Sequence, residues 1–194
     1  MPQAVMEKPH VKKKKHWTYE DYFALDDGNR YEVFEGELIM TPAPRTFHQR
    51  LSHRLDNLLS TFVQNNKLGV VFYSPTDVVF GEDIVLQPDL LFILKERLDI
   101  IGEKAILEAP DLVIEILSES TAQIDTVRKK RIYAEYGVRE YWIVDPDDHS
   151  IEVFENKDGH FFSFSYAHQK GKVQSKILDG FTVEIEHFFK PISK

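Results

Sequence analysis

The sequence predicts one domain of mixed α and β structure (an α/β chain of the α+β kind), in which a mixed β-sheet is flanked by helices. Three observations predict it. Apolar residues recur at helical spacing over residues 51–66, continuous apolar runs typical of buried strands cover 89–94 and 112–117, and short alternating strands with turn signals follow residue 150. The 194 residues are 42% hydrophobic and include 14 Phe and 8 Tyr, so they can bury one sizeable core.

Charge is distributed unevenly along the chain. The net charge is −8 and the pI about 5.5, which excludes a protein that binds nucleic acid through bulk positive charge. Lys12–Lys15 form a basic run, and blocks of like charge usually form solvated tails. We therefore expect a disordered basic arm over residues 1–16 and a single domain over 17–194.

Several classes of protein are excluded by what the sequence lacks. There is no cysteine, which excludes disulfides, cysteine-ligated zinc and thiol catalysis and is compatible with a reducing cytoplasm. No apolar stretch approaches the ~20 residues of a membrane span, and the N-terminus has no apolar core of a secretory signal. We expect a cytoplasmic protein with no membrane partner.

The N-terminal half is predicted to hold two helices and a hairpin. Thr18 can cap a short helix, with Asp21 three residues on as a weak form of the capping box. Residues 31–40 are typical of a hairpin that turns at Glu35-Gly36, and the amphipathic helix follows over 51–66.

The rest of the chain alternates strands with one further helix. A charged excursion over 95–109 can hold a short helix, and a second helix is expected from about residue 122 to Gly137, a residue that often ends helices. The predicted strands are 70–74, 76–80, 83–87, 89–94, 112–117, 140–145, 150–155, 160–166, 172–178 and 181–185.

Glu115 is the residue in this pattern that most needs an explanation. It is the one charged residue in the apolar run 112–117. An unpaired ionised carboxylate in an apolar interior costs several kcal/mol or changes its pKa until it is neutral. Glu115 therefore needs a partner, a metal ion or a catalytic role.

Two further features converge on Glu115. Asp89 opens an apolar strand directly after Pro88, and neighbouring strands could place its carboxylate beside that of Glu115. Asp125, Lys129 and Tyr133 recur at i, i+4 and i+8 of the following helix, so they share one face. Two close carboxylates repel each other unless a cation lies between them, and hard divalent ions such as Mg²⁺ or Mn²⁺ prefer oxygen ligands.

These residues carry a resemblance to a known family. The stretches "QPDL", "PDLVIEILSEST" and "DTVRKKRIYAEYGVREYWIVDP" resemble the bacterial family of "putative restriction endonucleases", catalogued as a domain of unknown function within the PD-(D/E)xK nuclease superfamily. The resemblance covers roughly residues 18–190. It implies a restriction-endonuclease-like core with an extra N-terminal hairpin and a β-rich C-terminal tail. It also implies metal-dependent hydrolysis of phosphodiesters, with DNA as substrate and RNA not excluded, and often a homodimer.

The resemblance also implies roles for individual residues. Asp89 and Glu115 match the motif's acidic metal ligands, with the backbone carbonyl of Ile116 as a third ligand for Mg²⁺ or Mn²⁺. The superfamily's Glu-x-Lys would place its lysine where this chain has Leu117. In the family it resembles, the lysine lies in the following helix, and Lys129 holds that place.

The supporting residues are less well defined. An additional acid from the N-terminal segment is common in the superfamily, and Glu37 and Glu32 are both candidates, with His48 a weaker one. Asp125 and Tyr133 are interpreted as groups that support Lys129 and Glu115 from the helix.

Other interpretations remain open. Glu115 could be a structural acid paired with Lys129 or Arg128, and the scaffold could be a non-catalytic module for nucleic-acid binding or dimerisation. A glycosidase would need two carboxyls flanking an open cleft, and nothing marks a sugar platform. The exposed aromatics expected in the tail could form a dimer surface or the face of a sandwich; they are Phe162, Phe164 and Tyr166.

Overall fold

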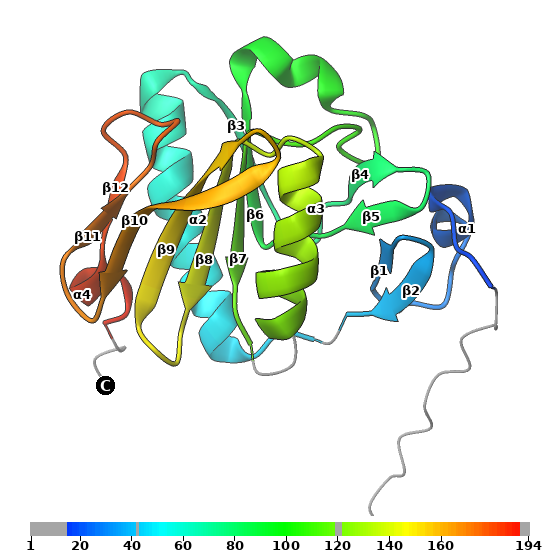
Figure 1. The fold of residues 1–194 in the computed structure, drawn as a ribbon, viewed down its shortest axis with the longest axis horizontal. Helices are drawn as coiled ribbons and strands as arrows, with labels where there is room; N and C mark the ends of the chain where they lie inside the picture. Colours follow the sequence, from blue (N-terminus) through cyan, green and yellow to red (C-terminus); the bar gives the residue numbers. More distant parts are fainter. Residues whose placement is uncertain (1–14, 42, 119–121, 191–194) are drawn as a thin grey trace, which may run out of the picture.

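The computed structural model describes residues 15–41, 43–118 and 122–190. The predicted basic arm over 1–16 lies almost wholly outside these residues. The predicted α+β class and the sheet flanked by helices are confirmed, since the described chain forms a central mixed sheet with a helix on each face (Figure 1).

The main sheet runs in the order β10-β9-β8-β7-β6-β3. Only the pair β7–β8 is parallel within this described sheet, because a helix connects these two strands, and the other neighbours pair antiparallel. Its strands are β3 (Gly69–Tyr73), β6 (Leu90–Leu94), β7 (Leu112–Ile116), β8 (Glu140–Asp145), β9 (Ser150–Lys157) and β10 (His160–His168).

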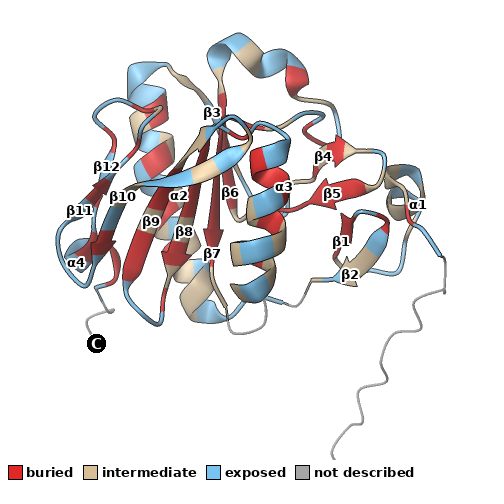
Figure 2. Cartoon of the chain, in the orientation of Figure 1, coloured by how far each residue is buried: buried red, intermediate tan, exposed pale blue. Residues whose placement is uncertain are grey.

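The central strands are buried on both faces, as the red strands in Figure 2 show. The long helix α2 (Thr46–Asn66) covers one face with the stripe Leu51, Leu55, Leu59 and Val63. The other face is covered by the helix that follows β7, made of the π-helical segment η2 (Ile124–Lys129) and α3 (Lys130–Glu135). Coverage of both faces explains why β6 is continuously apolar and why β7 is apolar apart from Glu115.

The N-terminal hairpin belongs to a second sheet, of order β2-β1-β5-β4. The hairpin turns at Glu35-Gly36, as predicted, with both residues at positive φ (52° and 82°), which suits a two-residue turn. Its strands are β1 (Tyr31–Phe34), β2 (Glu37–Met40), β4 (Val78–Gly81) and β5 (Ile84–Leu86).

Most predicted elements are confirmed, and the differences are local. The predicted strand 172–178 is only three residues long, because Glu140 accepts backbone N–H groups from Lys176 and Ile177 and holds that segment in a turn. The predicted helix after β7 is real, but its first part is π-helical. The remaining elements are α1 (Tyr19–Phe23), the 3₁₀ segment η1 (Lys95–Ile100), β11 (Lys172–Gln174), β12 (Thr182–Glu184) and α4 (Ile185–Phe188).

Candidate functional site

A cavity of about 290 Å³ lies where the N-terminal hairpin, the start of α2, strands β6 and β7 and segment η2 meet. Asp89, Glu115, Ile116 and Lys129 all line it. The structure therefore brings together the four residues that the sequence nominates for metal binding and catalysis.

Strand register places the two carboxylates beside each other. In the β6–β7 pair, Leu90 lies opposite Ile114, so Asp89 and Glu115 take the next pair of facing positions. Facing residues of an antiparallel pair point to the same side of the sheet. The carboxylate of Asp89 also accepts a hydrogen bond from the backbone N–H of Ile116 at 2.8 Å, which joins it to the end of β7.

Lys129 brings an ammonium group to these acids from the helix. Its Nζ lies 2.9 Å from Glu32 Oε1, 3.0 Å from Glu115 Oε1 and 3.5 Å from Asp125 Oδ1, and the side chain is only 6% exposed. Tyr133, one turn on, donates its hydroxyl to Glu115 Oε1 at 2.7 Å. Asp125, Lys129 and Tyr133 thus share one face, as their spacing predicts.

The charged groups of this cluster alter one another's pKa values. Burial raises the pKa of Glu115 well above its usual value, and repulsion from Asp125, Asp89 and Glu32 adds to that effect against the attraction of Lys129. Burial alone would lower the pKa of Lys129, but its three carboxylate neighbours outweigh burial and raise it well above 10.5. Three carboxylates therefore contact one firmly protonated lysine, and Asp89 adds a fourth acid to the lining of the same cavity.

The sequence itself matches the model of one protein family. Residues 19–186 match the Uma2 family, described as "Putative restriction endonuclease". This chain belongs to the Uma2 family. No curated protein is similar enough to be matched.

A solved structure shares the fold of this chain. It is described as a putative nuclease belonging to DUF820 from Anabaena variabilis ATCC 29413, and it aligns with a TM-score of 0.75 over 89% of this chain and 97% of its own. The two sequences are 21% identical, so the likeness establishes the fold.

The donor atoms of this cavity suit a hard divalent ion. Its four acids supply oxygen ligands, which are the ligands that such an ion prefers. No three acidic or histidine side chains in the described parts of the chain already converge as a ready ligand set. The expected set requires only two such side chains, Asp89 and Glu115, with the Ile116 carbonyl, and Mg²⁺ usually keeps several waters.

Of the two N-terminal acids, Glu32 is the one that lines the cavity. The structure places Glu37 elsewhere: its carboxylate is 62% exposed and pairs with Arg128 Nη1 at 2.9 Å. Both acids point to the same face of the hairpin, since Glu32 faces Ile39 and Glu37 faces Phe34. Glu37 lies at the turn end of that face, beyond reach of Glu115.

His48 and Gln87 also line the cavity. His48 Nε2 lies 3.1 Å from Asp89 Oδ2, and this carboxylate raises the pKa of His48 against the lowering effect of burial. The backbone N–H of Gln87 donates to Glu32 Oε1 at 2.8 Å. Gln87 was missed in the sequence, although its place two residues before Asp89 on an extended segment puts both side chains on one side.

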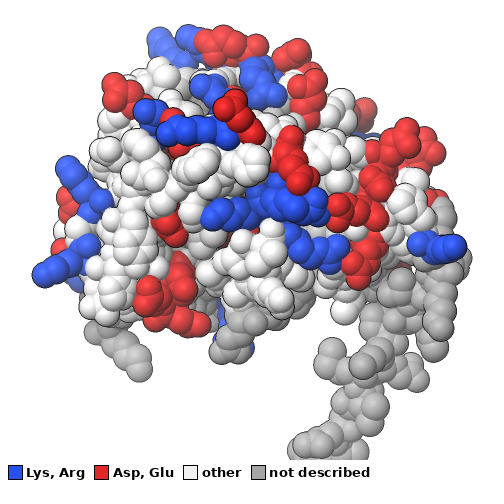
Figure 3. All heavy atoms as spheres, viewed as in Figure 1, with Lys and Arg blue, Asp and Glu red and all other residues white. Residues whose placement is uncertain are grey.

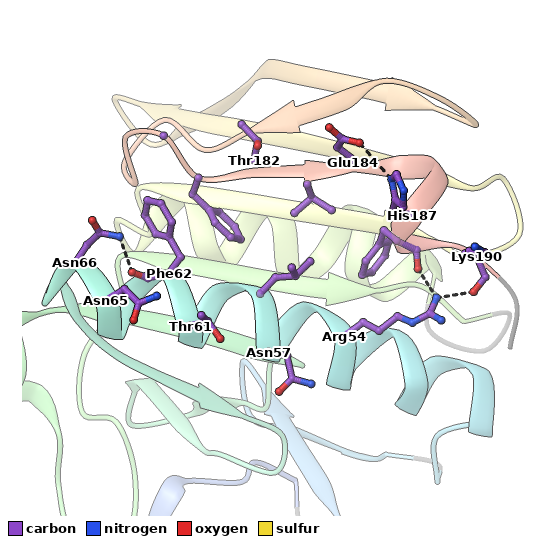
Figure 4. Close-up of a pocket in the computed structure, with 15 residues that line it drawn as sticks. Arg54, Asn57, Thr61, Phe62, Asn65, Asn66, Thr182, Glu184, His187 and Lys190 are labelled. Carbon is purple, nitrogen blue, oxygen red and sulfur yellow. Dashed lines mark hydrogen bonds and ion pairs between the residues drawn. The ribbon is translucent and has the colours of Figure 1, made fainter.

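A larger groove, of about 890 Å³, lies between α2 and the C-terminal elements β12 and α4 (Figure 4). Its polar groups are mainly amides from α2, and its carboxylate, Glu184, pairs with His187 at 3.2 Å. Size alone would favour this groove, but it contains no pair of acids. The chemistry of a nuclease site therefore favours the smaller cavity.

Within the described residues, no helix combines the length and the apolar character that a membrane-spanning segment requires.

Proposed function

We propose that this protein is a divalent-metal-dependent endonuclease that hydrolyses phosphodiester bonds of DNA. The observation that carries the proposal is a pair of carboxylates on neighbouring strands with a buried lysine ammonium 3.0 Å from one of them. Family membership supports a nucleic acid as the substrate.

Asp89, Glu115 and the backbone carbonyl of Ile116 would hold Mg²⁺ or Mn²⁺. When bound, such an ion polarises a phosphoryl oxygen and lowers the pKa of a coordinated water. The hydrogen bonds to Asp89 from His48 and from the Ile116 N–H fix this carboxylate, and the Tyr133 hydroxyl fixes Glu115.

Lys129 acts in this proposal as a fixed positive charge. Because its carboxylate neighbours raise its pKa, it stays protonated and cannot accept a proton from water at neutral pH. It can donate hydrogen bonds to the attacking water or to a non-bridging oxygen of the scissile phosphate. Glu32 and Asp125 hold the ammonium in place for this task.

A non-catalytic module on the same scaffold is the rival function. One observation favours it: Lys129 already pairs with three carboxylates, as in a structural salt-bridge cluster. The rival predicts that the cluster is indifferent to metal ions. The position of Asp89 beside Glu115, apart from the three acids that contact Lys129, supports the nuclease instead.

Metal binding and nicking separate the two functions. Mn²⁺ is titrated by calorimetry into wild type, Glu115→Gln and the control Glu184→Gln, which removes an exposed carboxylate outside the cavity. The same preparations are incubated with supercoiled plasmid and Mn²⁺. We expect wild type and Glu184→Gln to bind the ion and nick DNA, and Glu115→Gln to do neither.

A wild type that binds no Mn²⁺ and leaves the plasmid intact would establish the rival. Replacing the plasmid with a labelled RNA in the same assay decides between DNA and RNA as the substrate. We also propose a homodimer, which light scattering after size exclusion tests directly.

A further inference from the structure

Arg30 is a cation of the cavity that no carboxylate neutralises. Its Nε and Nη2 donate to Gln87 Oε1 at 3.2 and 3.0 Å, and Nη2 also donates to Ser74 Oγ at 2.8 Å. Within residues 15–41, 43–118 and 122–190, no acidic side chain lies within ion-pair distance of Arg30. Both of its acceptors are neutral, so they orient the guanidinium and leave its charge available.

The orientation of Gln87 is itself fixed. Its Nε2 donates to Asp77 Oδ1 at 2.7 Å and to the Tyr22 hydroxyl at 3.1 Å. The carboxylate of Asp77 can only accept, so the amide oxygen of Gln87 must face Arg30. This network extends from α1 to the cavity and holds one arginine in a defined position.

Arg30 lies beside the acidic cluster. It precedes Glu32 by two residues on the same extended segment, and Gln87 precedes Asp89 in the same way, so both pairs line one wall. Thr41 lies opposite Arg30, with its N–H donating to the Arg30 carbonyl at 2.8 Å. The Thr41 hydroxyl is buried and has no hydrogen-bond partner among the described residues, so the wall has donor capacity to spare beside an available positive charge.

Two arginines beside the site, Arg128 and Arg131, are already paired with acids. Figure 3 shows Lys and Arg over α3 interspersed with Asp and Glu. Arg128 pairs with Glu37, and Arg131 pairs with Glu35 and Glu135. This face is therefore not a basic strip that could bind a polyanion.

We propose that Arg30 binds a phosphate of the nucleic-acid backbone next to the scissile phosphodiester, while Gln87 and Ser74 hold its guanidinium. The proposal rests on the nuclease function above and adds a substrate-binding residue to it. Gln87 and Ser74 occupy Nε and Nη2, so Nη1 keeps two N–H groups that can donate charge-assisted hydrogen bonds to phosphate oxygens. It would also offset the repulsion between the acidic cavity and the phosphate backbone.

The test is the salt dependence of DNA binding without hydrolysis. Binding of a fluorescein-labelled 20-bp duplex is measured by anisotropy over a KCl series, with Ca²⁺ present because it takes the same kind of oxygen ligands in looser geometry. The proteins are wild type, Arg30→Gln and the matched control Arg131→Gln, which removes an arginine outside the cavity. Losing one phosphate contact should lower the slope of log K against log [KCl] by about 0.9.

For Arg30→Gln we expect this change in slope and an affinity about tenfold lower, whatever the duplex sequence. Arg131→Gln should match wild type. A second variant, Ser74→Asp, keeps Arg30 but puts a carboxylate beside its Nη2, and it should produce the same loss. Thermal melting reports whether each variant is folded. If Arg30→Gln does not fold, Ser74→Asp decides.

Three results would overturn the role of Arg30: an unchanged slope in both cavity variants, an equal loss in Arg131→Gln, or no duplex binding by wild type. Failure of the nuclease function is a separate outcome. If wild type binds DNA through Arg30 but never nicks plasmid, the role of Arg30 stands and the proposed nuclease function is wrong. If wild type nicks plasmid but the salt slope is the same with and without Arg30, the nuclease function stands and the role of Arg30 is wrong.

Discussion

Lys129→Met is the substitution that tests the charge arrangement of the cavity most directly. Methionine keeps an unbranched side chain of similar length but removes the ammonium that Glu32 and Glu115 contact at 2.9 and 3.0 Å. Those carboxylates are 8% and 4% exposed, so solvent can replace little of the lost attraction. We expect the metal-free variant to be less stable than wild type.

The size of the effect follows from the burial of the group. Removing one partner of a buried ion pair typically costs about 3–5 kcal/mol, because the other charge stays buried without compensation. For a domain of this size each kcal/mol corresponds to roughly 2–4 °C in Tm, so a fall of about 10 °C is expected. Part of this loss is offset if Glu115 takes up a proton.

Calorimetric melting in EDTA measures the loss of stability, and melting in excess Mn²⁺ measures how far the ion stabilises each protein. A ligand at 100 times its Kd stabilises any native protein by about 2.7 kcal/mol. Lys129→Met should gain more from Mn²⁺ than wild type does, because the ion also supplies the missing positive charge. The control Lys157→Met breaks a surface pair with Glu155 and should change Tm by about 2 °C or less.

An unchanged Tm for Lys129→Met in EDTA would show that the ammonium does not compensate these acids, and the charge argument would fail. If Mn²⁺ raises the Tm of Lys129→Met no more than it raises that of wild type, the ammonium is structural and the argument for a cation site fails.

Two further predictions concern buried acids. Glu115 has a raised pKa in the folded protein, so the native state binds its proton more tightly than the unfolded chain does; its contribution to stability therefore falls as pH rises above its unfolded value near 4.5. Urea unfolding in EDTA from pH 4 to pH 8 should show this slope in wild type relative to Glu115→Gln, and parallel curves would contradict the raised pKa. Glu140 accepts four hydrogen bonds, from the Trp142 ring, the Ser175 hydroxyl and two backbone N–H groups. Glu140→Gln should lower stability by about 2–4 kcal/mol while Mn²⁺ affinity stays as in wild type, because it turns an acceptor into a donor outside the cavity.

The hairpin shows where sequence reasoning reached its limit. Glu32 and Glu37 lie on the same face, so strand alternation could not rank them. Their distance along the strand separates them, because each residue advances the chain by about 3.3 Å and Glu37 lies at the turn. Position in the pattern gave a usable signal: Glu32 lies between the apolar residues Tyr31 and Val33, whereas Glu37 directly follows the turn residue Gly36.

Arg30 and Gln87 could not be paired from the sequence, because their contact joins positions 57 residues apart. The partners on one helix were predictable, since helical spacing alone places Asp125, Lys129 and Tyr133 together. The π-helical segment was not predictable from that pattern. It ends at Lys129 and adds a residue to the turn that presents this side chain, and such segments occur often at functional sites.

The position of Lys129 bears on the role proposed for it. The strand position that the superfamily motif would fill is Leu117, yet an ammonium still lies 3.0 Å from Glu115, supplied by the following helix. Electrostatics depends on where the charge lies and not on which element carries it, so a helix that packs on the same strand can replace a strand residue. The replacement adds a constraint, because the helix must be held close to β7. Glu32 on the hairpin and Asp125 on the helix both contact the ammonium, so the two elements that flank the cavity are joined through the residue that is proposed to act in it.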